Sequence, residues 1–185
     1  MRILFVNGSP RPQGNTGTML RHLAKKAEEG GAEVSYLDLG QMKVQDCDGC
    51  YRCDTEDRCL REDDMQEAYE LLRTADVLIL GSPIYMGAET GIIKCFVDRL
   101  YYLMSKKSER PGRRAAVFFT CGRVEGHMVY GYMHNRYHKL LADDLGFDDV
   151  RTFIVSGMRT KVNVDENYYA QDTLKELEGF IFPAG

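Results

Sequence analysis

The stretch RILFVNGSPRPQGNT, residues 2–16, places a short apolar run directly before a loop rich in glycine, proline and polar side chains. The apolar run predicts a buried strand over 2–7. The apolar positions that follow at helical spacing predict a helix over 15–29, which Gly30-Gly31 would end. A strand, a loop and a helix in this order form the first unit of an α/β fold.

The same unit recurs along the 185 residues. Further strands are predicted at 33–39, 77–80, 114–120 and 151–157, followed in turn by helices at 63–75, 90–105, 127–145 and 165–180. The apolar runs do not alternate with polar residues, as is typical of parallel strands covered on both faces. We therefore expect one domain, 1–185, with three layers: a doubly wound five-stranded parallel sheet of order 2-1-3-4-5 between helices.

Composition limits the function classes. The net charge of −4 gives no reason to expect a nucleic-acid partner. The apolar run near the N-terminus is too short for a signal-peptide core, and no later stretch approaches the length of a membrane span. We expect a cytoplasmic protein with no membrane partner, in which thiols are kept reduced.

The loop after the first strand is the first candidate binding site, because ligands of such sheets bind where the strand order reverses. Its glycines, Gly8 and Gly14, fit neither a dinucleotide fingerprint nor a P-loop. A glycine- and hydroxyl-rich loop that opens a helix favours an anion such as phosphate. The side chains available for it are those of Ser9, Arg11, Asn15 and Thr16. The alternative is that Asn15 or Thr16 only caps the helix.

The third strand ends in GSPIYMG, residues 81–87. A Gly-Pro-aromatic turn exposes backbone groups to the edge of a planar ligand, and Tyr85 and Met86 offer flat, soft contact area. In the alternative interpretation Tyr85 only packs on its neighbours. A phosphate site at one loop and a flat ring at the other together suggest a mononucleotide such as FMN.

The motifs GSPRPQGNT, ADVLILGSPIYMG and GIIKCFVDRL resemble those of the flavodoxin-like NAD(P)H-dependent FMN reductase superfamily, whose order the whole chain follows. The resemblance implies that Ser9, Arg11, Asn15 and Thr16 hold the FMN phosphate. It implies that the isoalloxazine is lined by Pro83, Ile84, Tyr85, Met86 and Gly87. It also implies that the loop TCGRVEG closes the site through Thr120, Gly122 and Arg123. No residue is a convincing general base or nucleophile, so the chemistry would be carried by FMN.

The segment CDGCYRCDTEDRC, residues 47–59, lies in a long loop over 40–62 that follows the second strand. We expect this loop at the same carboxyl edge as the flavin site. Its thiols could be plain reduced cysteines, a zinc site or the ligands of an iron–sulfur cluster. Zinc ribbons usually separate two C-x-x-C pairs by a long loop, whereas successive C-x-x-C steps are how bacterial ferredoxins bind a 4Fe–4S cluster.

The cysteine motif also resembles that of the iron-sulfur flavoproteins, a branch of the same superfamily. That resemblance implies one 4Fe–4S cluster held by Cys47, Cys50, Cys53 and Cys59. It further implies a homodimer or homotetramer in which cluster and flavin of neighbouring subunits exchange electrons. The expected function is a redox enzyme that takes electrons from NAD(P)H or ferredoxin and passes them to a small acceptor. The alternatives are a cluster-free NAD(P)H-dependent FMN or quinone reductase and a non-enzymatic electron carrier.

Four further features are interpreted as structural. Lys94 and Asp98, four residues apart on a predicted helix, are expected to form an ion pair. Cys95 is expected to be a buried core thiol. The histidines at 127, 134 and 138 are expected on a polar face, since no H-E-x-x-H pattern accompanies them. The tyrosines and methionines at 101–104 and 130–133 are expected in the core or at a subunit interface.

Overall fold

The computed structural model describes residues 1–106, 110–159 and 163–183. Its five strands are all parallel and lie in the order β2-β1-β3-β4-β5, which confirms the flavodoxin-like prediction. The strands are β1 (Arg2–Asn7), β2 (Glu33–Asp38), β3 (Val77–Pro83), β4 (Arg114–Thr120) and β5 (Asp149–Val155). The order reverses between β1 and β3, so the loops that follow these two strands diverge and leave room for a ligand.

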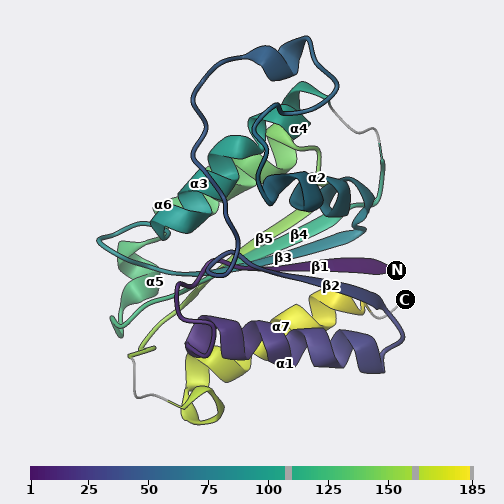
Figure 1. Cartoon of the computed structure of the whole chain (residues 1–185). Coiled ribbons are helices and arrows are strands. Elements are labelled where there is room, and N and C mark those ends of the chain that lie inside the picture. The colour runs from purple at the N-terminus through teal and green to yellow at the C-terminus, as the bar shows by residue number, and fades with distance from the viewer. Residues whose placement is uncertain (107–109, 160–162, 184–185) are drawn as a thin grey trace.

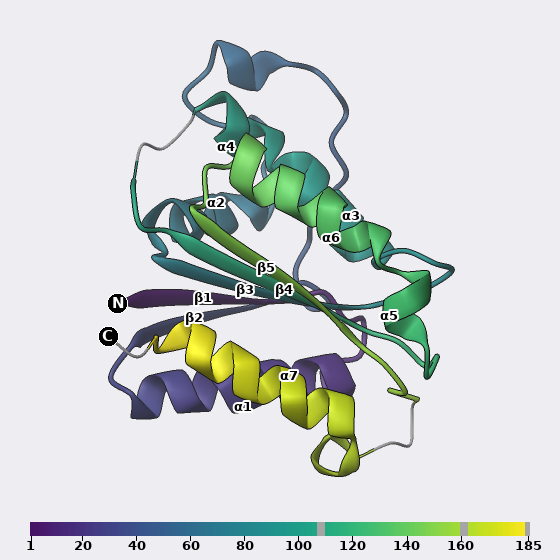
Figure 2. The same ribbon diagram turned by 180° about the vertical axis from the view of Figure 1, so that it is seen from behind.

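Helices cover both faces of the sheet (Figure 1). One face carries α1 (Asn15–Glu29) and α7 (Tyr168–Ile181). The other face carries α2 (Met65–Thr74), α3 (Gly91–Arg99), α4 (Tyr101–Ser105) and α6 (Tyr132–His138). Figure 2 shows the short helix α5 (Gly126–Val129) beyond the carboxyl ends of the strands. Within the described residues, no helix has the length and apolar character needed to cross a membrane.

Each face of the sheet has its own apolar core. Leu4 and Val6 of β1 pack with residues of α2, α3 and α6, whereas Ile3 and Phe5 pack with α1 and α7. All seven residues of β3 are buried. Burial on both faces accounts for the continuous apolar runs in the sequence, because neither side of a strand meets water.

Two of the predicted helices are divided in the structure, and the last one begins at a different residue. The helix expected over 90–105 is split at Leu100, whose N–H bonds the Val97 carbonyl three residues back. The helix expected over 127–145 is broken into α5, α6 and a π-helical turn over Lys139–Asp144. The last helix begins at Tyr168, later than expected, because the side chain of Asn167 caps the Ala170 N–H at 2.9 Å.

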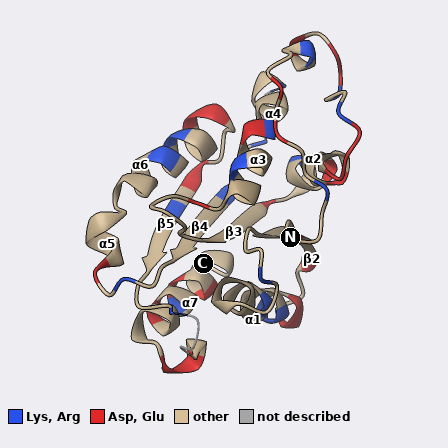
Figure 3. Ribbon diagram, turned by 60° about the vertical axis from the view of Figure 1, so that its left-hand side comes forward, with Lys and Arg blue, Asp and Glu red and all other residues tan. Residues whose placement is uncertain are grey.

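The connection from β2 to α2 carries the cysteines away from the carboxyl edge of the sheet. Figure 1 shows it crossing the helix layer to reach α4. Ser105 of α4 donates to the Cys53 carbonyl at 3.3 Å, and the Tyr102 hydroxyl donates to the Asp57 carbonyl. Acidic and basic residues both occur along this connection (Figure 3). The expectation that the cysteines lie at the same edge as the flavin loops is therefore wrong, since α4 holds them at the far end of α3.

Candidate functional site

A pocket of about 340 Å³ lies at the carboxyl edge of the sheet, where β1, β3 and β4 end. Nine of the twelve residues expected at the flavin line it: Ser9, Arg11, Asn15, Thr16, Pro83, Ile84, Tyr85, Thr120 and Gly122. Met86, Gly87 and Arg123 do not line it. The wall is completed by three residues outside these twelve, Cys121, Met158 and Arg159. Four segments far apart in the sequence, which follow β1, β3, β4 and β5, thus meet around one space.

The loop before α1 is shaped by its own backbone. The helix cap is Gly14, which makes no side-chain capping bond, so the interpretation of Asn15 or Thr16 as the cap is wrong. The first N–H groups of the helix lack partners within the helix and face the loop. Ser9 Oγ donates to the Arg11 carbonyl and accepts from the Arg11 N–H, both at 3.1 Å, which folds the loop back on itself. These features suit an anion.

Side chains of the first loop connect it to the other walls of the pocket. The hydroxyls of Thr16 and Thr120 lie 2.8 Å apart and are buried, which joins α1 to the end of β4. Asn15 donates its side-chain amide to the Arg159 carbonyl at 3.2 Å. The N-terminus of α1 is therefore held in place by two of the strand ends that form the pocket.

The turn after β3 is a tight hairpin. Tyr85 and Ala88 exchange backbone hydrogen bonds of 2.8 and 3.1 Å around Met86 and Gly87, both of which have positive φ angles (50° and 89°). Met86 is fully exposed and Tyr85 is 42% exposed. The Tyr132 hydroxyl of α6 donates to the Gly87 carbonyl, which fixes the turn from outside. Met86 and Gly87 thus shape the turn, while Tyr85 faces the pocket.

The three additional wall residues follow β4 and β5. Cys121 is buried, and a methyl group at Gly126 would lie only 2.2 Å from its sulfur, so this glycine is needed for close packing. Burial raises the pKa of the Cys121 thiol, which favours its neutral form. Met158 and Arg159 follow the edge strand β5 and carry no recognisable motif. Only the rule that ligands bind beyond the carboxyl ends of parallel strands could have pointed to them.

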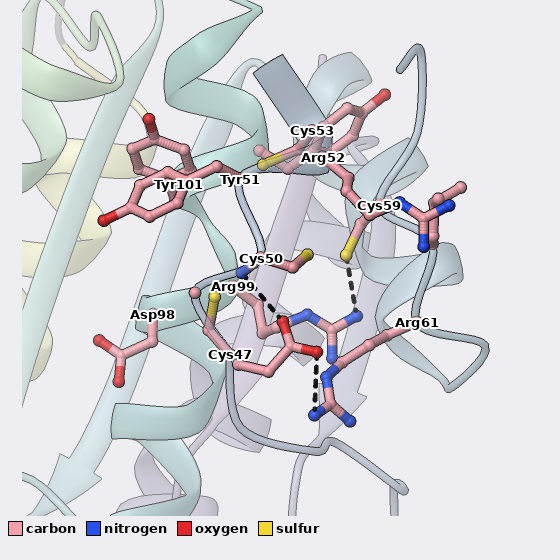
Figure 4. A pocket seen from close by; sticks show the side chains of 14 residues that line it. Cys47, Cys50, Tyr51, Arg52, Cys53, Cys59, Arg61, Asp98, Arg99 and Tyr101 are labelled. Carbon is pink, nitrogen blue, oxygen red and sulfur yellow. Dashed lines mark hydrogen bonds and ion pairs between the residues drawn. The ribbon is translucent and has the colours of Figure 1, made fainter. Parts of the chain in front are cut away.

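A second pocket, of about 390 Å³, is lined by all four clustered cysteines together with residues from the ends of α3 and α4. Figure 4 shows Cys47, Cys50, Cys53 and Cys59 around this space, with the Arg99 guanidinium beside Cys59. Cys47 and Cys50 are exposed, and the other two are partly buried. Burial and the nearby Asp54 carboxylate raise the pKa of the Cys53 thiol.

The chain was compared with known proteins. The family model described as NADPH-dependent FMN reductase matches residues 1–136, which hold the loops after β1, β3 and β4 and the cysteine segment. The chain belongs to this family. The expected membership of the FMN reductase family is thereby confirmed.

Two relatives within the family are iron-sulfur flavoproteins. One, from Methanocaldococcus jannaschii, is 35% identical over 54% of this chain, and the match spans 51% of its own length. Another, from Methanosarcina thermophila, is 28% identical over 81% of this chain and 82% of its own length. These relatives confirm that the chain resembles the iron-sulfur flavoprotein branch.

A solved structure supports the fold. The NAD(P)H:quinone oxidoreductase from Methanothermobacter marburgensis superposes with a TM-score of 0.75 at 18% identity, over 99% of this chain and 98% of that one. At this identity the likeness concerns the arrangement of strands and helices alone.

The two pockets were tested against the cofactors that the family implies. The first pocket offers a helix N-terminus, hydroxyl donors and a flat aromatic side chain, which suits a flavin mononucleotide. The second offers four thiols, the ligand type and number of a 4Fe–4S cluster. Their sulfurs are not drawn together, however: among the described residues, no three His, Cys, Asp or Glu side chains form a group that could hold a metal ion. The cysteines fit the cluster in kind and number, and binding it would require the loop to close further.

The remaining candidates have structural roles. Lys94 and Asp98 form the predicted ion pair. Cys95 is partly exposed, so the expectation of a core thiol is wrong. The three histidines of the α5–α6 region are exposed, as expected for a polar face. Of the tyrosines and methionines at 101–104 and 130–133, Tyr102 and Met133 are buried in the core, and Tyr132 is 52% exposed.

Proposed function

We propose that this protein is an FMN-dependent oxidoreductase of the iron-sulfur flavoprotein type, with FMN in the pocket at the sheet edge and one 4Fe–4S cluster at the cysteine pocket. The observation that carries the proposal is the convergence of three separate loops, at the ends of β1, β3 and β4, on one pocket. FMN takes up two electrons and releases them one at a time, whereas a cluster carries single electrons. The role of the chain is to bind, orient and shield both groups.

In this proposal the first loop binds the FMN phosphate. Backbone N–H groups at the start of α1 point toward it, Arg11 supplies a positive charge, and Ser9, Asn15 and Thr16 add polar contacts. The overall charge of −4 makes such local geometry necessary, since the protein as a whole repels anions. Pro83, Ile84 and Tyr85 provide the wall for the ring, and Met86 and Gly87 shape that wall as the tip of the turn. Thr120, Gly122 and Arg123 belong to the loop that closes the opposite side.

The flavin assignment is tested by adding negative charge at the phosphate position. The variant Asn15→Glu/Thr16→Glu should fold but lose FMN, because two carboxylates would repel the phosphate. The control Thr18→Glu adds a carboxylate to the same helix turn at an exposed position and should retain FMN. FMN content is measured from the visible spectrum of anaerobically purified protein. A folded double variant with the same FMN content as the wild type would refute the assignment.

The four cysteines are proposed as the ligands of one cluster. Cys47, Cys50 and Cys53 follow one another at C-x-x-C spacing, and Cys59 lines the same pocket from the other side of the loop. Iron and acid-labile sulfide assays on anaerobic protein decide between the interpretations. About four irons and four sulfides per chain support the cluster. Zinc, or no metal, leaves the cluster-free FMN or quinone reductase as the function.

The electron donor is proposed to be NAD(P)H or ferredoxin, with a small molecule as acceptor. Rapid multiple turnovers with NAD(P)H and a quinone would support the enzyme. Reduction only through ferredoxin, with no turnover of small acceptors, would support the electron carrier instead.

The protein is also proposed to form a homodimer or homotetramer. Large apolar side chains are exposed around the flavin pocket: Tyr85, Met86, Val124, Met128, Val129 and Tyr132. Tyr132 bonds Gly87 of the turn that carries Met86, which brings exposed apolar side chains from two parts of the chain close together. An exposed apolar patch of this kind marks an interaction site. A second copy of the chain at this patch would cover the flavin pocket. Light scattering that gives a 21.1 kDa particle at micromolar concentration would contradict the proposal.

A further inference from the structure

The C-terminal end of α3 carries a buried ion pair beside the cysteine pocket. The side chains of Arg99 and Asp63 are 1% and 2% exposed. Arg99 Nη1 and Nη2 donate to the two oxygens of the Asp63 carboxylate at 2.6 and 3.1 Å. The free energy lost when two charges are removed from water offsets much of the free energy gained from their attraction. A buried ion pair is therefore poor evidence for a purely stabilising role. Its surroundings indicate another role.

The pair joins the two ends of the cysteine loop. Gln45, two residues before Cys47, donates its N–H to Asp63 at 3.0 Å, and its carbonyl accepts from Arg99 Nη1 at 3.2 Å. Asp63 itself lies four residues after Cys59. Both the entry and the exit of the loop are thus bound to one guanidinium–carboxylate pair, which is anchored to the core through α3.

The same guanidinium reaches a cysteine sulfur. Arg99 Nη2 lies 3.5 Å from Cys59 Sγ, a contact drawn as a dashed line in Figure 4. Arg99 Nε donates to the Tyr69 hydroxyl at 3.2 Å, and that hydroxyl donates back to the Arg99 carbonyl. All five N–H groups of the guanidinium therefore have a partner. Its orientation is fixed, and a lysine ammonium, with three donors and no planar fork, could not replace it.

We propose that Arg99 is a positioning residue for the cluster: it closes the loop over 45–63 and donates an N–H to the sulfur of Cys59, which makes the cluster easier to reduce. This inference rests on the proposed function, since Cys59 must be a cluster ligand. A hydrogen bond to a ligating sulfur stabilises the negative charge gained on reduction, and such bonds tune cluster potentials. Asp63 balances the charge of Arg99, so the effect comes from the N–H directed at the sulfur rather than from net charge.

Two Arg99 variants and one control test the proposal. Arg99→Met/Asp63→Leu removes both charges together, a replacement that is often neutral for folding. Arg99→Lys keeps the charge but loses donors. The control Arg61→Lys keeps the charge of another arginine of the same pocket, whose side chain contacts Asp48 and Gln45 and has no hydrogen bond to a cysteine among the described residues. For each variant we would measure iron and sulfide content, the midpoint potential of the cluster, and trypsin cleavage of the metal-free chain after Arg52 or Arg58.

Both Arg99 variants should show a more negative midpoint potential than the wild type, whereas Arg61→Lys should not. Cleavage should be at least about tenfold faster in both, because proteolysis follows the population of the opened loop. An unchanged potential in an iron-loaded Arg99 variant would overturn the N–H to sulfur role, and unchanged cleavage would overturn loop closure. Wild-type protein without iron would refute the cluster and with it the effect on potential. Cleavage of the metal-free chain would still decide loop closure, so the two failures can be told apart.

Discussion

Gly17 offers a sharp test of the proposed phosphate loop, because it lies in the first turn of α1 against the loop itself. A methyl group at this position would lie 2.3 Å from the Pro12 carbonyl oxygen and 3.1 Å from the Asn7 amide nitrogen. The Pro12 oxygen also accepts from Arg21 Nη1 at 2.7 Å and is therefore not free to move. Gly17→Ala should push the loop outward by about 1 Å, since ordinary contacts begin near 3.4 Å.

Gly17→Ala is expected to weaken FMN binding more than it lowers the stability of the fold. Overpacking of this kind costs about 1–3 kcal/mol. Alanine within a helix is about 0.5–1 kcal/mol more stabilising than glycine, which offsets part of this loss. The net loss of stability should then be no more than about 2.5 kcal/mol, which corresponds to a fall in Tm of at most about 10 °C for a chain of this size. FMN affinity should fall by a larger factor, on the order of 10- to 100-fold, because a misplacement of about 1 Å disturbs several phosphate contacts at once.

The assay is a fluorescence titration of the apoprotein with FMN, paired with a thermal melt. Gly179→Ala is the matched control, since Gly179 lies in helix α7 and a methyl group there would meet nothing within 4 Å. This control should melt slightly higher than the wild type and bind FMN equally well. If Gly17→Ala binds FMN as tightly as Gly179→Ala does, the loop before α1 does not hold the phosphate.

Three further predictions concern the cysteine pocket and the apolar surface. Cys53→Ser should leave a yellow, folded protein that lacks iron and sulfide, measured by metal analysis beside the visible spectrum; loss of FMN as well would contradict two independent pockets. Asp63→Asn leaves Arg99 buried without its charge partner and should cost about 3–5 kcal/mol, seen as a fall in Tm of about 6–20 °C. Burial raises the pKa of Asp63, but hydrogen bonds from Arg99 and the Gln45 N–H outweigh burial and hold it below the usual value. The stabilisation from Asp63 is therefore present above the unfolded pKa of about 3.9 and is lost as pH falls through the folded pKa. Melting curves of Asp63→Asn should lack this loss on the acid side, and parallel curves for the two proteins would refute the assignment. Met128→Asp should raise the dimer dissociation constant at least about tenfold in sedimentation experiments, because a charge in the apolar patch must be desolvated on association; an unchanged constant would place the interface elsewhere.

The flavin pocket could be predicted from the sequence because its walls follow strands. Once the apolar runs place β1, β3 and β4 in a parallel sheet, the residues just after each strand must meet at one edge. This rule points to the segments that hold Ser9 and Pro83, whereas Thr120 is expected from the resemblance to the FMN reductases. Met158 and Arg159 occupy an equivalent place after β5 but carry no motif, so nothing in their residue types marks them.

The position of the cysteine loop could not be predicted, since it depends on contacts between distant residues. The pair of Arg99 with Asp63 joins positions 36 residues apart, and the bond from Arg99 to Gln45 spans 54. The sequence pattern of a loop after β2 indicates only where the loop starts. Helical periodicity likewise does not reveal the breaks in the helix expected over 127–145, at Gly131 and at the π-helical turn over Lys139–Asp144.

Helix α3 has a consequence for the path of electrons. The flavin turn precedes its first residue, Gly91, and the cysteine pocket lies beside its last, Arg99. Nine residues of α-helix extend about 13 Å, so the helix separates the proposed flavin pocket from the cysteine pocket of the same chain. Electron tunnelling weakens steeply with distance. A neighbouring subunit that brings its own cysteine pocket to the exposed flavin edge would offer a shorter route. Electron exchange would then occur in the oligomer and not within a single chain. Diluting the protein until its subunits separate would stop the exchange.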